Sequence, residues 1–338
     1  MSEIGNKKSD SLLEILDVVK DNYAIVDSYL KANNVINRYQ HPCCSISGGK
    51  DSDIMLDIVT KIDTKKRVKY VFFDTGIEYQ ATKDHLDYLE KRYGITIIRE
   101  KASMPIPLAV KKYGQPFLSK NVSDMIYRLQ KHNFQWEDDT YENLAKKYPN
   151  AKAALKWWTN YKDNDVDGMS RFSIRRNKLL KEFLMANPPQ FLISNKCCYY
   201  AKKKPAHDFI EREYCDLMIL GVRKAEGGIR STAYKNCFTN NDDNDRDISQ
   251  YRPLFYYCKQ DEEIYDERFN IKHSDCYCKY GLKRTGCVGC PYSRNLNEEI
   301  AIMEEFEPKV AKAAHNIFKD SYEYTKKYRK FIEQYEAA

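Results

Sequence analysis

Apolar positions in the first third of the chain follow two different periods. Residues 43–47, 68–73 and 95–99 are short apolar runs that predict strands, and 68–73 is apolar at nearly every position, as expected for a strand buried on both faces. Between the first two runs, Ile54, Met55, Ile58 and Val59 recur at helical spacing, and a second helix is predicted over residues 82–93. This alternation predicts a doubly wound, mostly parallel α/β sheet.

The rest of the chain extends this pattern. A helix is predicted over residues 10–33, ahead of the first strand. Two later strands of the same sheet, and a helix between them, are predicted at 191–194, 217–222 and 205–214. The polar segment 239–249 predicts a flexible surface loop. Residues 298–336 predict helix that breaks near Pro308, because proline lacks a backbone N–H.

Composition restricts the class of protein. Of 338 residues, 42 % are apolar and 31 % are charged, which is globular and excludes wholesale disorder. No stretch approaches about 18 consecutive apolar residues, and the first residues lack the apolar core of a signal peptide, so we expect a cytoplasmic protein with no membrane partner. The 56 Lys and Arg residues outnumber the 49 Asp and Glu residues, but the charges are interspersed. This balance fits a solvated surface and permits an anionic partner.

A glycine-containing segment stands where the first strand gives way to a helix. Its sequence is Ser47-Gly48-Gly49-Lys50-Asp51-Ser52. Glycines let the backbone approach a phosphate closely, the helix N-terminus supplies N–H groups and a positive dipole, and Lys50 adds a charge. The spacing differs from the Walker motif, Gly-x-x-x-x-Gly-Lys. The segment therefore predicts a phosphate loop of another type.

The sequence predicts that the chain has four parts. Residues 1–102 hold the N-terminal helices and the first half of the nucleotide-binding domain. Residues 103–185, longer than a simple crossover, form a helical insertion that carries all three tryptophans. Residues 186–297 complete the sheet and hold paired cysteines, and residues 298–338 are C-terminal helices.

The phosphate loop resembles the PP-loop of the adenine nucleotide alpha-hydrolase superfamily. That resemblance implies that Ser47, Gly48, Gly49, Lys50, Asp51 and Ser52 hold the phosphates of ATP or the phosphosulfate of an activated sulfate. Further segments resemble the phosphoadenosine phosphosulfate (PAPS) reductase family. They are Asp74-Thr75-Gly76 beside the nucleotide, the Cys-Cys-x-x-x-Lys-x-x-Pro-like segment 197–205, Gly221-x-Arg223-x-x-Glu226-x-x-x-Arg230, and the closing Cys287-x-x-Cys290. Arg223 and Arg230 are then expected to face anionic groups of the substrate.

Eleven cysteines point to metal, cluster or redox chemistry in a reducing compartment. Cys197-Cys198 and Cys287-x-x-Cys290 resemble the arrangement of cluster-bearing adenylylsulfate reductases, which implies a [4Fe–4S] cluster on four thiolates. Zinc also accepts four thiolates, but adjacent cysteines diverge and suit a cluster better. Buried structural thiols are the third alternative. Cys276 and Cys278 are substitute ligands, persulfide carriers or buried loop thiols, and Cys43-Cys44 is expected to pack in the core.

One departure from the family changes the expected reaction. Sulfonucleotide reductases carry a nucleophilic cysteine in a C-terminal Glu-Cys-Gly-x-His segment, whereas no cysteine follows Cys290 here. In this respect the chain resembles the ATP pyrophosphatase of DNA phosphorothioation systems more than true reductases. Lys50 and the loop amides would stabilise the leaving pyrophosphate, Arg223 and Arg230 would neutralise phosphates, and Asp51 and Asp74 are candidate ligands of Mg²⁺.

Three functions remain open from the sequence. The first is an ATP-dependent, cluster-containing sulfur-transfer enzyme, supplied with sulfur by a cysteine desulfurase. The second is a PAPS or adenylylsulfate reductase with a relocated thiol at Cys276 or Cys278, and the third is a nucleotide-binding regulator or phage accessory protein with a sensor cluster. The acceptor is not named by the sequence. The insertion is either a lid that packs on the core or an element that recognises a large substrate. In the second case, its basic residues with Trp136, Trp157 and Trp158 would suit nucleic acid through phosphate contacts and stacking.

Overall fold

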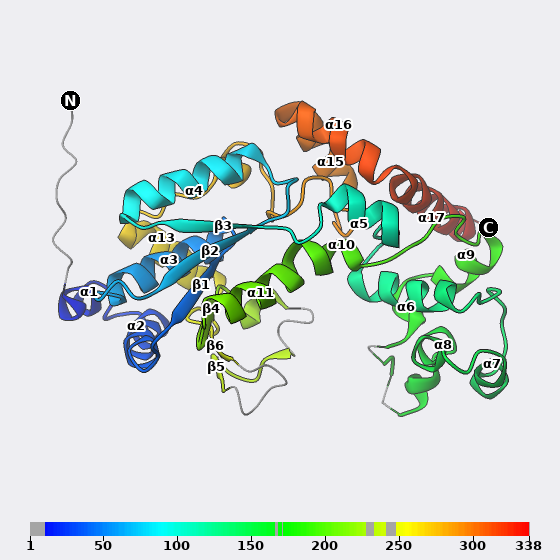
Figure 1. Cartoon of the computed structure of the whole chain (residues 1–338), viewed down its shortest axis with the longest axis horizontal. Helices are drawn as coiled ribbons and strands as arrows, with labels where there is room; N and C mark the ends of the chain where they lie inside the picture. The colour runs from blue at the N-terminus through cyan, green and yellow to red at the C-terminus, as the bar shows by residue number, and fades with distance from the viewer. Residues whose placement is uncertain (1–10, 166–167, 171, 228–232, 241–247, 338) are drawn as a thin grey trace. The chain divides into compact units, whose positions relative to one another are not determined.

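The computed structural model describes residues 11–165, 168–170, 172–227, 233–240 and 248–337 (Figure 1). The chain forms two compact units, each made of two segments. The sheet unit comprises Met1–Ala102 and Lys204–Gly286, and the helical unit comprises Ser103–Lys203 and Cys287–Ala338. Each unit is described below by itself.

Six strands make one sheet in the sheet unit (Figure 1). They are β1 (Pro42–Ile46), β2 (Lys69–Asp74), β3 (Ile97–Lys101), β4 (Leu217–Leu220), β5 (Phe238–Thr239) and β6 (Ser249–Tyr251), in the spatial order β3-β2-β1-β4-β6-β5. All neighbours pair in parallel except β5 and β6, which are antiparallel. The predicted doubly wound, mostly parallel α/β fold is confirmed. The order in which the strands are added to the sheet reverses between β1 and β4, and sheets of this type bind ligands at this point.

Both faces of the sheet are covered. Alternate residues of β1, Cys44 and Ile46, pack with α2 (Tyr23–Ile36), α3 (Lys50–Ile62), α4 (Gln80–Tyr93) and α13 (Lys259–Phe269). Cys43 faces the other way and packs with Phe209 of α11 (Lys204–Arg212). The helix predicted over 10–33 is two helices, α1 (Leu12–Val18) and α2, because the Asn22 side chain accepts the Ile25 N–H and starts a new helix.

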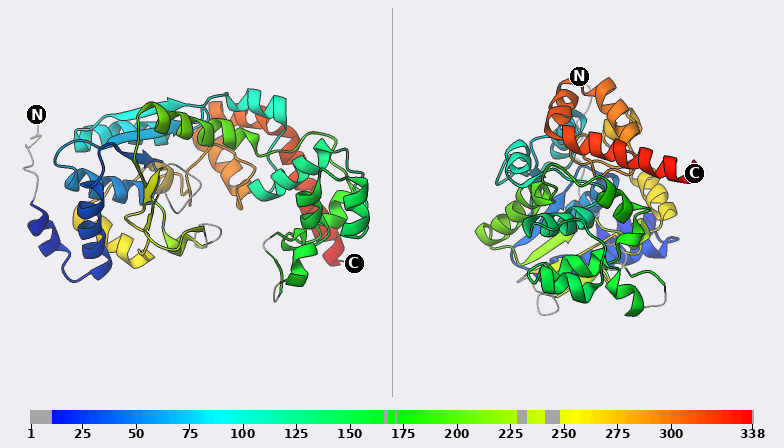
Figure 2. Two further views of the ribbon diagram at one scale, coloured as in Figure 1. Left: turned by 60° about the horizontal axis from the view of Figure 1, so that its bottom comes forward. Right: turned by 90° about the vertical axis from the view of Figure 1, so that its right-hand side faces the viewer.

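Helices build the helical unit. Its first segment, Ser103–Lys203, contains α5 (Ile106–Tyr113), α6 (Lys120–Lys131), α7 (Tyr141–Lys147), α8 (Lys152–Trp158), α9 (Leu180–Ala186) and the short α10 (Lys196–Cys198). The C-terminal segment contains α15 (Leu296–Phe306), α16 (Pro308–Ile317) and α17 (Lys319–Ala337), so the predicted break at Pro308 is confirmed. Figure 2 shows the red helix α17 among the green helices of the insertion, where Tyr324 packs on Phe183 with ring centroids 4.9 Å apart.

The strand predicted at 191–194 is wrong. Ile193 makes a single parallel bridge with Gln115 and does not join the six-stranded sheet. The Gln130 side chain binds this segment instead, accepting from the Ile193 N–H and donating to the Phe191 carbonyl. Ile193 is fully buried in the core of the helical unit, so its apolar character comes from that core.

The tryptophans belong to this same core, which agrees with the packing alternative for the insertion. Trp157 and Trp158 are 1 % and 0 % exposed, and Trp136 is half-buried against Trp158 with ring centroids 5.8 Å apart. The Trp158 indole N–H donates to the Glu137 carbonyl at 2.9 Å. Large aromatic side chains stabilise a small helical unit through the area they bury.

Two further expectations concern the sheet unit. Cys43 forms a disulfide with Cys215, just before β4, whereas the sequence predicted unlinked packing; Cys44 is buried in the core as expected. Of the loop predicted at 239–249, residues 241–247 lie outside the described residues, while Thr239 ends β5 and Ser249 begins β6. Among the described helices, none is both long and apolar enough to cross a membrane.

Candidate nucleotide site and cysteine cluster

The phosphate loop connects β1 to the N-terminus of α3. Gly48 has a φ of +68°, and a Cβ there would lie 2.8 Å from Cγ2 of Thr82, so this position requires glycine. The Ser47 N–H donates to Ser52 Oγ at 2.9 Å, which closes the loop on the helix. Gly49 is the N-cap of α3 and offers no side-chain cap. The first-turn amides and helix dipole therefore face the loop, as in anion-binding loops.

The sheet topology brings the second predicted motif to this loop. Gly221 and Arg223 follow β4, which pairs with β1. A Cβ on Gly221 would lie 3.3 Å from the backbone of Asp51, so glycine permits the close approach of the two segments. Nε of Arg223 lies 3.0 Å from Oδ1 of Asp51. The loop and the arginine, both predicted from motifs, are adjacent at the switch point of the sheet.

Glu262 of α13 is a third member of this group that the sequence did not reveal. Its Oε1 lies 2.7 Å from Nε of Arg223, and its side chain is 14 % exposed. Burial, and then the neighbouring carboxylate of Asp51, raise the pKa of Glu262 well above its usual value. Asp51 and Glu262 thus share one arginine, and the raised pKa keeps the Glu262 carboxyl protonated near neutral pH. In the sequence Glu262 lies within an ordinary acidic run, Asp261-Glu262-Glu263, with no distinguishing spacing.

The triplet Asp74-Thr75-Gly76 begins at the last residue of β2, the strand next to β1. Oδ1 of Asp74 accepts the Gly76 N–H at 2.8 Å, and the buried Thr75 hydroxyl donates to Glu78 at 2.7 Å. These bonds fold the triplet into a tight turn at the carboxyl edge of the sheet. Arg230, the other predicted arginine, lies in 228–232, outside the described residues.

The four predicted cluster cysteines all lie in the helical unit. Cys197 and Cys198 are on α10, and a tight turn joins the other pair, with the Cys290 N–H donating to the Cys287 carbonyl at 3.3 Å. Gly289 within that turn has a φ of +62°, and a Cβ would lie 2.8 Å from Sδ of Met303. Cys287 and Cys290 contribute electrostatically to the raised pKa of Cys197. The two pairs, which are far apart in the sequence, therefore influence each other electrostatically.

The cysteines of this cluster differ in the pKa of their thiols. A hydrogen bond from Cys197 lowers the pKa of the Cys198 thiol, and the nearby ammonium groups of Lys120, Lys202 and Lys203 lower it further. Burial raises the pKa of Cys290. Iron–sulfur clusters are held by thiolates, so four thiols that influence each other electrostatically are suitable ligands for one. Within the described ranges, no group of three or more His, Cys, Asp or Glu side chains is arranged to hold a metal ion, and this includes the aspartates considered for Mg²⁺.

Cys276 and Cys278 belong to the sheet unit, on α14 (Asp275–Cys278). Cys276 is fully buried with its sulfur 3.4 Å from the Thr82 hydroxyl, whereas Cys278 is exposed. Thr82 is also the residue that contacts Gly48, so Cys276 packs behind the phosphate loop. Of the two thiols, Cys278 is the accessible one.

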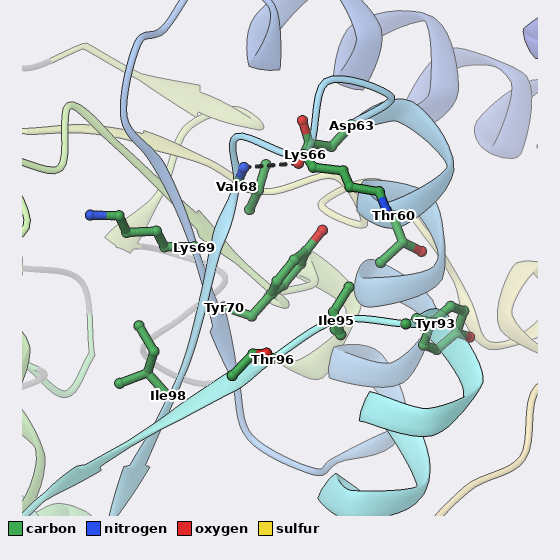
Figure 3. Close-up of a pocket in the computed structure, with 11 residues that line it drawn as sticks. Thr60, Asp63, Lys66, Val68, Lys69, Tyr70, Tyr93, Ile95, Thr96 and Ile98 are labelled. Atoms are coloured by element: carbon green, nitrogen blue, oxygen red, sulfur yellow. Dashed lines mark hydrogen bonds between the residues drawn. The ribbon is translucent and has the colours of Figure 1, made fainter.

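A separate cavity of about 430 Å³ lies at the other edge of the sheet (Figure 3). Its lining includes Val68 and Tyr70 at the start of β2 and Ile95 before β3, and Asp63 accepts the Val68 N–H at 2.8 Å. The phosphate loop follows the carboxyl end of β1, so this cavity is not part of the candidate nucleotide site.

Comparisons with known proteins agree with the motifs. The family model of the phosphoadenosine phosphosulfate reductase domain matches residues 41–161, which include β1, the phosphate loop and β2, and confirms the resemblance predicted from the sequence. The matched domain is that of an enzyme family. An uncharacterized protein of Methanocaldococcus jannaschii is 25 % identical over 323 residues, covering 92 % of this chain and 50 % of its own length. The chain therefore spans about half the length of that relative.

Two solved structures are similar to this chain. The PAPS reductase of Candida auris has a TM-score of 0.44 and 13 % identity, covering 83 % of this chain and 98 % of its own. The U34-tRNA thiolase NcsA of Methanococcus maripaludis, solved with its [4Fe-4S] cluster, has a TM-score of 0.38 and 15 % identity, covering 92 % of this chain and 80 % of its own.

Proposed function

From the match of residues 41–161 to the phosphoadenosine phosphosulfate reductase domain, we propose that this chain is an adenine-nucleotide-dependent sulfur-transfer enzyme. It cleaves ATP to AMP and pyrophosphate to activate an acceptor, and Cys197, Cys198, Cys287 and Cys290 hold a [4Fe–4S] cluster. The main support for the proposal is the ion pair beside the phosphate loop, in which Arg223 Nε lies 3.0 Å from Asp51 Oδ1. An arginine already placed at such a loop fits binding of a polyphosphate.

The proposed reaction has two displacements. An acceptor oxygen attacks the α-phosphorus of ATP, the bond to the β-phosphate oxygen breaks, and pyrophosphate leaves. A sulfur nucleophile then displaces AMP, which carries away the acceptor oxygen. Lys50 and the α3 amides stabilise the charge on the leaving pyrophosphate, while Arg223, and by the motif Arg230, bind substrate phosphates. Asp51 and Asp74 are the carboxylates that would meet a Mg²⁺ ion brought in with the nucleotide.

The cysteine cluster supports the sulfur-transfer half of the proposal. When bound, the cluster supplies redox-active iron and sulfide. Lys120, Lys202 and Lys203 favour the thiolate form of Cys198, which is the form that binds iron. The sulfur itself would come from a donor such as a cysteine desulfurase.

A basic cavity in the helical unit supports an anionic acceptor, for which we propose nucleic acid. The cavity, of about 300 Å³, is lined by Tyr127, Arg128, Lys131, His132 and Lys196, among others. The Lys196 ammonium lies 5.8 Å from the ring centroid of Tyr127, and Lys196 directly precedes Cys197. Lysine and arginine beside an aromatic ring suit phosphates and bases of a single strand.

The second candidate function is a sulfonucleotide reductase that uses a relocated thiol. The exposed Cys278, in the same unit as the phosphate loop, is the observation that favours it. Its thiolate would attack the sulfur of PAPS, break the S–O bond and expel adenosine 3′,5′-bisphosphate, which leaves a thiosulfonate on Cys278. A thiol reductant would then release sulfite and be oxidised to a disulfide. Cys276 is too buried for this role.

One experiment separates these functions. Protein purified without oxygen is assayed for iron, sulfide and zinc, then incubated with ATP or with PAPS and a thiol reductant. About four iron and four sulfide per chain, with pyrophosphate from ATP, support the proposal. Sulfite from PAPS that disappears in Cys278→Ser overturns it in favour of the reductase. Zinc without sulfide means structural thiols, and nucleotide binding without turnover supports a regulator.

A further inference from the structure

Three hydroxyl groups converge on one point beside the phosphate loop. A Cβ built on Gly49 would lie 3.1 Å from the Tyr277 hydroxyl, 3.2 Å from Ser47 Oγ and 3.5 Å from Thr285 Oγ1. Ser47 belongs to the loop, whereas Tyr277 and Thr285 come from more than 200 residues later in the chain. The two distant hydroxyls also contact each other at 3.2 Å. The bare Cα of Gly49 therefore leaves a small polar space bounded by three hydroxyl groups.

The positive charge of Lys50 lies close to these hydroxyl groups. The Lys50 ammonium lies 5.3 Å from the ring centroid of Tyr277, so the ring holds the lysine by a cation–π contact. Burial raises the pKa of Tyr277, which keeps its hydroxyl protonated and able to donate. An ammonium with neutral hydroxyl donors is a combination that favours an oxyanion.

The segment that brings these hydroxyls is firmly anchored. His273 Nδ1 lies 2.8 Å from Oδ2 of Asp53 on α3, and its Nε2 lies 2.9 Å from Oδ2 of Asp266 on α13. Burial opposes a charge on His273, but the carboxylates of Asp266 and Asp53 outweigh it and raise the pKa to about 9. The imidazolium thus ties residues 273–285 to the helix that begins at the phosphate loop.

We propose that Tyr277 and Thr285, with Ser47 and Lys50, form a subsite for the part of the nucleotide that leaves as pyrophosphate. The inference rests on the proposed function, since it assumes a nucleotide in the phosphate loop. The hydroxyls donate to oxygens of the β- and γ-phosphates, and Lys50 turns from the Tyr277 ring toward the same oxygens. AMP, which lacks these phosphates, does not use the subsite.

The test compares the binding of ATP, AMP and inorganic pyrophosphate to the full chain by calorimetry. Tyr277→Phe keeps the ring beside Lys50 and removes the hydroxyl, Thr285→Val removes the second hydroxyl, and Thr285→Ser retains it. We expect Tyr277→Phe and Thr285→Val to weaken pyrophosphate and ATP binding about tenfold, as for hydrogen bonds to charged groups, with AMP binding unchanged and Thr285→Ser close to wild type. The matched control is Tyr280→Phe, whose ring packs on Tyr79.

The outcomes separate the two proposals. If wild-type protein binds ATP and pyrophosphate, and Tyr277→Phe and Thr285→Val bind them equally well, the subsite is wrong while the proposed function stands. If wild-type protein binds neither, the proposed function fails and the subsite fails with it. Equal loss of AMP and pyrophosphate binding in Tyr277→Phe also overturns the subsite, because it indicates general damage to the loop. Circular dichroism and thermal unfolding of each variant verify that it is folded.

Discussion

Arg223 Nε lies 3.0 Å from Asp51 Oδ1, although 172 positions separate the two residues in the chain. The contact exists because β1 and β4 are neighbours while the intervening chain builds β2, β3 and the helical insertion. Asp51 starts the helix after β1, and Arg223 follows β4, so both stand at the carboxyl edge where the strand order reverses. Asp51 and Glu262 are the two carboxyl partners of this arginine.

Lys50→Ala is expected to lower the rate of pyrophosphate formation from ATP by about 10²–10³-fold, the range measured for a lost donor to a developing oxyanion. Lys50 belongs to the loop itself, and its ammonium lies 5.3 Å from the ring centroid of Tyr277. The measurement is pyrophosphate release at saturating ATP. Lys20→Ala is the control, since Lys20 is exposed and pairs with Asp17 on the surface. A Lys50→Ala enzyme as fast as the control would exclude the loop as the site of phosphate chemistry.

His273→Asn tests the ion pairs that anchor residues 273–285. The pKa of His273 is raised from 6.5 to about 9 in the folded state, so its stabilisation is fully present below about pH 6.5 and is lost as pH rises through 9. We expect the variant to unfold more easily than wild type at pH 6, by on the order of 3 kcal/mol, and by much less at pH 9.5. Urea unfolding at both pH values measures the difference. His315→Asn, which alters an exposed pair with Glu304, is the control.

A pH-independent loss in His273→Asn would contradict the ion-pair account and assign His273 a packing role. The groups that face its ring are the Asp53 and Asp266 carboxylates, with His85 on the other oxygen of Asp53, 3.0 Å away, and the Tyr277 ring nearby. Any variant effect that follows a different pH range must therefore come from one of these neighbours.

Site residues that lie in a local motif could be predicted from the sequence, whereas those whose role requires contact between distant segments could not. The phosphate loop and Arg223 lie in local motifs at the ends of strands, and a parallel sheet places such ends at one edge. Glu262 and His273 act only because α13 and the segment after it return to α3, which no local spacing in the sequence indicates. Residues 191–194 have the composition of a strand, but a helical core buries them equally well.

Trp158→Ala is expected to destabilise the helical unit by about 3–5 kcal/mol, the usual cost of removing a large aromatic side chain from a core. Trp158 is 0 % exposed and contacts Phe134 and Trp136 edge-on, with centroids 5.3 and 5.8 Å away. Chemical unfolding followed by tryptophan fluorescence measures the effect. Phe172→Ala, at a side chain that is 61 % exposed, should change stability little. Unchanged stability with lost nucleic acid binding in Trp158→Ala would restore a stacking role for the indole.

Cys290→Ser is expected to remove most of the iron and sulfide from protein purified without oxygen, because a serine hydroxyl replaces one of four thiolate ligands. The half-buried Cys290 influences the pKa of Cys197, and Cys198 in turn influences the pKa of Cys290, so the loss of Cys290 should affect the whole group. The readout is iron and sulfide content with the visible absorbance of the cluster. Cys278→Ser is the matched control, since Cys278 is exposed and lies in the sheet unit. If Cys278→Ser loses iron and Cys290→Ser keeps it, the cluster ligands have been assigned to the wrong cysteines, and the sulfur-transfer proposal loses its second support.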